Sequence, residues 1–87
     1  MKLILAIVRD SDSDPVTQGL TSASFRVTRV ASTGGLLRRG MTTLLIGLEA
    51  EQVEDAIKVL RQTCTPASEG VQRATLFVVP VDRFEQI

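Results

Sequence analysis

Residues 31–40 hold the backbone and side-chain groups best suited to binding an anion. The segment reads Ala-Ser-Thr-Gly-Gly-Leu-Leu-Arg-Arg-Gly. Paired glycines such as Gly34 and Gly35 let backbone N–H groups approach a ligand closely, and neighbouring hydroxyl and guanidinium groups can hold phosphate oxygens. Leu36 and Leu37 are unusual at the tip of a solvated hairpin. The segment is interpreted either as a ligand-binding loop or as a hairpin with turn glycines and solvating arginines, and it matches neither a Walker loop nor a dinucleotide fingerprint.

Three further residues could contribute to the same chemistry. Arg26 and Thr28 are two positions apart in an expected strand, so both side chains leave the same face of the sheet. A guanidinium fork beside a hydroxyl suits an anionic or nucleobase ligand, although an edge-strand charge beside a β-favouring threonine is the simpler reading. Gly47 interrupts an apolar strand, which indicates close approach either of a ligand or of a helix packed over that point.

The remaining reactive side chains argue against an enzyme or a metal site. The chain has no histidine and a single cysteine, Cys64, so a histidine-assisted nucleophile and a zinc site of ordinary composition are both excluded. Asp10, Asp12 and Asp14 resemble an oxygen-ligand cluster, but no later bidentate glutamate completes a calcium loop. We interpret Asp14 as a helix N-cap, the other two aspartates as solvated, and Cys64 as a core residue. We expect no catalytic residues and no metal.

The elements that must position these residues follow from the apolar patterns. Strands are expected at residues 3–8, 25–31, 42–48 and 74–79, the last stopped by Pro80. A short helix is expected to start with Asp14 as N-cap and Pro15 as first helical residue, and a longer one to span residues 51–64. The pattern of the second strand slips at Arg29 and Val30, which predicts a bulge or a change of neighbour there. The order βαββαβ is that of a ferredoxin-like α+β sandwich, with a four-stranded antiparallel sheet and two helices on one face, and residues 1–87 form a single domain.

The strands also predict that the second face of the sheet is covered. A solvated face would require alternating apolar and polar residues, and the first, third and fourth strands do not alternate. The simplest cover for so short a chain is another copy of itself, so we expect a homo-oligomer.

Composition narrows the choice of partners. Ten basic residues balance ten acidic ones, and only three aromatic residues are present, all phenylalanine. This disfavours nucleic acid and anionic membranes as partners. The single cysteine fits a reducing compartment, and the apolar start is too short to span a membrane, so a cytoplasmic location is expected.

Taken in order, these stretches resemble the PII-like cyclic di-AMP receptors of many Gram-positive bacteria. The matching residues are 1–8, the run 25–47 with its Ala-Ser-Thr-Gly-Gly motif, residues 55–64, and residues 74–86. The resemblance implies a bacterial signal-transduction protein, a homotrimer that binds cyclic di-AMP in clefts between subunits, reorders its loops and then contacts a protein target whose identity is unknown. It requires no other cofactor.

The resemblance implies ligand contacts at Arg26, Thr28, Gly47 and Gln86. With the loop residues Gly34, Gly35 and Leu37, they make up the candidate ligand-binding residues. The family usually has Phe and Asn where this chain has Leu36 and Met41, and the second loop is shortened to about residues 65–73. A trimeric regulator that binds another adenine nucleotide, or that acts only through protein contacts, is therefore the alternative.

Overall fold

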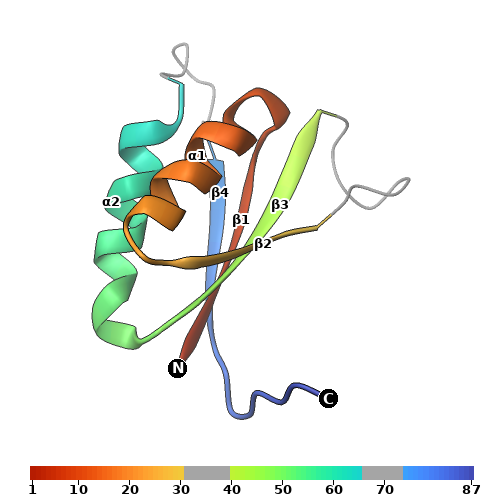
Figure 1. The fold of residues 1–87 in the computed structure, drawn as a ribbon, viewed down its shortest axis with the longest axis vertical. Helices are drawn as coiled ribbons and strands as arrows, with labels where there is room; N and C mark the ends of the chain where they lie inside the picture. The colour runs from red at the N-terminus through yellow and green to blue at the C-terminus, as the bar shows by residue number, and fades with distance from the viewer. Residues whose placement is uncertain (31–39, 66–73) are drawn as a thin grey trace.

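The protein folds as four strands and two α-helices in the expected order. The computed structural model describes residues 1–30, 40–65 and 74–87. The elements are β1 (Lys2–Arg9), α1 (Asp10–Ser22), β2 (Arg26–Val30), β3 (Met41–Leu48), a 3₁₀ turn (Ala50–Gln52), α2 (Val53–Thr63) and β4 (Ala74–Pro80) (Figure 1). This order confirms the βαββαβ prediction.

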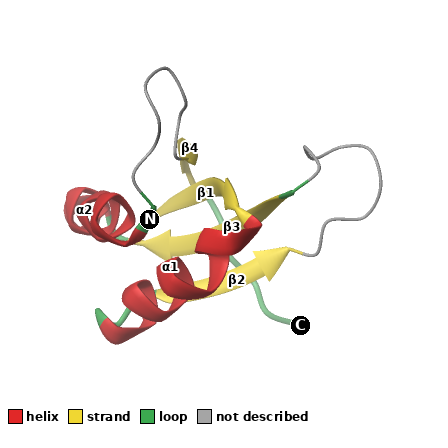
Figure 2. Ribbon diagram, turned by 90° about the horizontal axis from the view of Figure 1, so that it is seen from above, coloured by secondary structure: helices red, strands yellow, loops and turns green. Residues whose placement is uncertain are grey.

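The strands form one antiparallel sheet in the order β2-β3-β1-β4. Both helices lie on the same side of this sheet, and the C-terminal tail leaves on the other side (Figures 1 and 2). The chain therefore has the ferredoxin-like α+β fold, with one sheet face covered by helices. β2 and β4 are the two edge strands, and Pro80, which has no N–H to donate, ends β4.

The core lies between the sheet and the helices. Alternate residues of β1 (Ile4, Ala6 and Val8) are fully buried, as the period of two in a strand requires. The same side of β3 contributes Leu44 and Ile46. The helices complete the core with Val16, Leu20, Ala56, Leu60 and Cys64. The apolar stripe predicted for the second helix is confirmed, and Cys64 is a core residue.

The start of α1 differs from the prediction. The helix begins at Asp10, so Asp14 is not its N-cap and Pro15 lies inside it, and its 13 residues make it longer than expected. Contacts distant in sequence explain the extra turn. The Asp10 N–H donates to the Gly40 carbonyl at 2.9 Å, and the buried Asp12 carboxylate binds Thr65. These bonds offset the hydrogen bond that Pro15 cannot donate.

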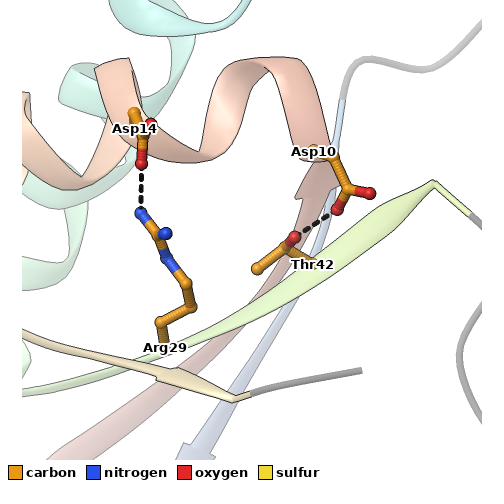
Figure 3. A network of polar contacts seen from close by, with 4 residues as sticks. All are labelled: Asp10, Asp14, Arg29 and Thr42. Carbon is orange, nitrogen blue, oxygen red and sulfur yellow. Dashed lines mark hydrogen bonds and ion pairs between the residues drawn. The ribbon is translucent and has the colours of Figure 1, made fainter. Parts of the chain in front are cut away.

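The predicted irregularity at the end of the second strand is also wrong. β2 keeps a regular register with β3, and Arg29 stands opposite Leu44 and Val30 opposite Thr43. Arg29 therefore faces the helices, where its guanidinium pairs with the Asp14 carboxylate at 2.5 Å (Figure 3). A polar partner on α1 explains why a charged residue interrupts the inward-facing pattern.

The two helices approach closely at Gly19. A Cβ atom added there would lie 2.8 Å from Cγ2 of Thr63 and 3.3 Å from Cγ1 of Val59, both on α2. Because atoms cannot approach that closely without displacement, glycine at this position permits the observed helix spacing.

Candidate functional site

Arg26, Thr28 and Gly47 meet on the sheet face opposite the helices. In the β2–β3 register, Arg26 stands opposite Gly47 and Thr28 opposite Leu45. Between them, Val27 and Ile46 contribute to the core, so alternate residues of both strands must point away from it. The paired segment of the two strands has six residues on this side, which we call the β2–β3 strip; they are Arg26, Thr28, Val30, Thr43, Leu45 and Gly47. The structure thus brings three of the predicted site residues together.

Arg26 and Thr28 have the properties of ligand contacts. Both are exposed, and no ion pair to Arg26 is present in the part of the chain that the structure describes. Arg29, one residue beyond Thr28, is by contrast engaged with Asp14 on the helix side. The guanidinium of Arg26 is thus available to an anion, and the Thr28 hydroxyl, two residues further along the same face, can donate or accept a hydrogen bond.

Gly47 leaves space on the strip that the described residues do not fill. A Cβ atom there would meet nothing within 4 Å. Among the glycines of the described segments, Gly40 has a positive φ and Gly47 does not. Neither backbone conformation nor a covering helix therefore calls for glycine at this position. The interpretation that a helix packs over Gly47 is wrong, because the residue faces away from both helices. Space beside an available guanidinium is what the close approach of a ligand or a second subunit would need.

The rest of this sheet face is mostly apolar, and the exceptions are Arg9 of β1 and Thr75 of β4. The cross-strand rows that begin in the strip continue across β1 with Leu3, Leu5 and Ile7. They reach the far edge of the sheet with Phe77 and Val79 of β4. Phe77 is 53% exposed, a large fraction for a phenylalanine at the middle of a strand. The face predicted to be covered is thus polar on β2 and mostly apolar on β1 and β4.

Two of the three aspartates at the start of α1 bond to the strands that carry the strip, and the third bonds to Thr65. Asp14 pairs with Arg29 of β2, and Asp10 accepts a hydrogen bond from the Thr42 hydroxyl of β3 (Figure 3). Asp12 is 1% exposed, and one of its oxygens accepts hydrogen bonds from the Thr65 N–H at 3.1 Å and the Thr65 hydroxyl at 2.5 Å.

These contacts correct the interpretation of the three aspartates. Asp14 does not cap a helix, and neither Asp10 nor Asp12 is merely solvated, because each accepts a hydrogen bond from a named partner. No group of residues with metal-ligand side chains occurs within residues 1–30, 40–65 and 74–87. The aspartates therefore have structural roles in positioning β2, β3 and Thr65, two residues after α2.

The other predicted site residues are not placed on the strip. Gly34, Gly35 and Leu37, together with Leu36, lie outside the described residues. Gln86 is exposed in the tail after β4, a tail held at its start by a hydrogen bond from the Val81 N–H to the Met1 carbonyl. For the described segments, no helix is long and apolar enough to cross a membrane.

Sequence reasoning did not single out Thr43. Its side chain is 6% exposed, and its hydroxyl is buried without a hydrogen-bond partner. The alternation of side chains along β3 could have placed Thr43 on the same face as Leu45 and Gly47.

The ferredoxin-like sheet, together with the family that the sequence matches, places the chain in the PII-like class of small α+β proteins. Residues 1–71 match the family described as cyclic-di-AMP receptor, and the chain belongs to that family. The fold is also similar to the crystal structure of a functionally unknown protein from Pediococcus pentosaceus ATCC 25745. That likeness has a TM-score of 0.79 and 32% sequence identity, over 99% of this chain and 96% of the other.

Proposed function

We propose that this protein is a signalling receptor that binds cyclic di-AMP on the β2–β3 strip. The observation that carries the proposal is the register of Arg26 with Gly47, which sets an available guanidinium beside unfilled space. A phosphodiester needs such a cationic donor, and close approach to the backbone is easiest at a residue without a side chain. Membership of the cyclic-di-AMP receptor family supports the choice of ligand.

We further propose that the binding unit is a homotrimer with its sites between subunits. The support is the apolar half of the same sheet face, where Leu3, Leu5, Phe77 and Val79 stand in neighbouring rows. Burying this surface against another copy would gain about 25 cal/mol for each Å² of apolar area removed from water. A copy seated there would also border the strip, so ligand and assembly would share one face. Loop rearrangement on binding and contact with a protein target complete the proposed signalling cycle.

Calorimetric titration tests the ligand, and light scattering tests the assembly. The protein should bind cyclic di-AMP in preference to cyclic di-GMP and ATP. Binding of ATP alone would favour another adenine nucleotide, and the absence of binding to all three would favour action through protein contacts alone. The mass in solution should be three times the 9.4 kDa of one chain, and a single-chain mass at micromolar concentration would contradict the assembly.

A further inference from the structure

Thr43 carries a buried hydroxyl to which the described residues offer no partner. The residue is 6% exposed, and its Oγ1 forms no hydrogen bond within residues 1–30, 40–65 and 74–87. Two other threonines do have partners: the Thr42 hydroxyl donates to Asp10 and the Thr63 hydroxyl to the Val59 carbonyl. A buried polar group without a partner is destabilising, so such a group calls for an explanation outside the contacts of the free chain.

The position of Thr43 indicates what that partner would be. The other buried polar atoms without partners belong to Asp12, Ser13 and Thr17 of α1, on the helix side of the sheet. Thr43 stands opposite Val30 of β2 and Ile7 of β1, in the same alternation as Leu45 and Gly47. Of these four residues, Thr43 is therefore the one that lies on the same face of the sheet as Arg26.

The strip has different chemistry at its two ends. Gly47 and Arg26 form one end, and Thr43 lies four residues back along β3, about 13 Å away at the rise of a strand. Apolar surface lies next to Thr43: Val30, which is 37% exposed, stands opposite it on β2, and Leu45 lies two residues further along β3. A flat ring could lie on that surface, while an anionic group would be held at the arginine end.

We propose that the Thr43 hydroxyl is a ligand-contacting group that hydrogen-bonds the edge of a nucleobase, at the end of the strip opposite the phosphate-binding Arg26. The assignment rests on the proposed nucleotide-binding function and adds a base-reading residue to it. A hydroxyl both donates and accepts, which matches the adjacent amino donor and ring-nitrogen acceptor at the edge of adenine. The ligand then satisfies the buried group that the free protein leaves without a partner.

Thr43→Val tests the assignment because it removes the hydroxyl and keeps the branched shape. With cyclic di-AMP as the probe, calorimetry should show about a five- to tenfold loss of affinity for Thr43→Val. Thr43→Ser, which restores the hydroxyl, and Thr75→Val, an exposed threonine on the same face of β4, should both stay within about twofold of the unchanged protein. The melting temperature of free Thr43→Val should equal or exceed that of the unchanged protein, since no bond of the free chain is lost.

Three results would overturn the assignment, and they are distinguishable. If the unchanged protein binds cyclic di-AMP and Thr43→Val binds equally well, the base contact is wrong and the proposed function stands. If the unchanged protein does not bind, both fail together. If free Thr43→Val melts more than about 4 °C lower, or changes its mass in solution, the hydroxyl has a partner within the protein or its assembly.

Discussion

Replacing Gly47 with alanine should separate stability from binding on the β2–β3 strip. The added methyl group meets nothing within 4 Å in the described chain, and the residue has no positive φ that would strain alanine. Gly→Ala at such a compatible position stabilises a protein by about 0.4–1 kcal/mol, chiefly by reducing the entropy of the unfolded chain. In a domain of this size, that corresponds to a rise in melting temperature of roughly 2–8 °C.

The same methyl group should weaken ligand binding. It would occupy the space beside Arg26 that the ligand is proposed to enter. Extra atoms in a closely packed contact cost about 1–3 kcal/mol, which corresponds to a loss of roughly five- to 150-fold in affinity for cyclic di-AMP. Thermal denaturation followed by circular dichroism and calorimetric titration measure the two effects on one preparation.

Gly19→Ala is the matched control for this experiment. It adds the same methyl group to a glycine between the helices, where the new atom would lie 2.8 Å from Thr63. Overpacking of about 1–3 kcal/mol should exceed the helix-propensity gain of about 1 kcal/mol, so Gly19→Ala should lower the melting temperature. Its effect on ligand affinity should be small, because Gly19 lies on the covered side of the sheet.

The pair of variants also exposes errors in the reasoning. A lower melting temperature for Gly47→Ala with unchanged affinity would show that the open space at Gly47 is filled by the protein itself. A change in the solution mass of Gly47→Ala would show that a neighbouring subunit, and not the ligand, occupies that space.

The remaining predictions concern the charged and hydroxyl groups around the strip. Arg26→Ala should weaken cyclic di-AMP binding by roughly ten- to 100-fold in calorimetry at an unchanged melting temperature, because the side chain is exposed and its proposed bond to phosphate is charge-assisted. A drop in melting temperature at constant affinity would make Arg26 structural. Thr65→Val should destabilise the fold by about 1.5–3 kcal/mol in urea titration, because it removes a donor to the buried Asp12 carboxylate. Thr65→Ser keeps the hydroxyl and should restore stability. Equal stability of the unchanged protein and both variants would contradict this role of Asp12. Asp14→Asn should change stability by less than about 1 kcal/mol in the same assay, because its ion pair with Arg29 is exposed, and a larger loss would show that the pair does more than an ordinary surface contact.

The periodic parts of the fold could be predicted from the sequence. The continuous apolar run of β1 indicates a strand, and the apolar stripe of α2 indicates which side of that helix is buried. The side of β2 that carries Arg26 and Thr28 followed from the same rule, since Val27 between them had to face the core.

The parts that could not be predicted depend on partners far along the chain. α1 starts at Asp10 because of contacts with Gly40, Thr42 and Thr65, and a helix-start signal within a few residues cannot contain that information. Arg29 looked like a break in the strand because its partner, Asp14, lies on a different element.

The candidate site required the sheet register as well as the pattern. Sequence pattern places Arg26 and Gly47 on their own strands but does not say that they stand opposite each other. Which face Gly47 occupies, and that nothing in the described chain fills the space above it, became known only from the assembled sheet. Thr43 was missed because a threonine in a strand is ordinarily explained by β propensity alone.

The bracing of β2 and β3 has a consequence for how this protein can evolve. The chain on either side of residues 31–39 is fixed by the pairing of Val30 with Thr43 and by the bond from the Asp10 N–H to the Gly40 carbonyl. With those ends held by the scaffold, each doubling of the length between them costs only about 0.6 kcal/mol of closure entropy. The pairing of β2 with β3 therefore tolerates a change in the length of this connection at a small entropic cost, as long as both ends keep their bonds. Under the proposed function, substitutions at Gly34, Gly35 and Leu37 would be a route by which ligand preference changes while this pairing is kept.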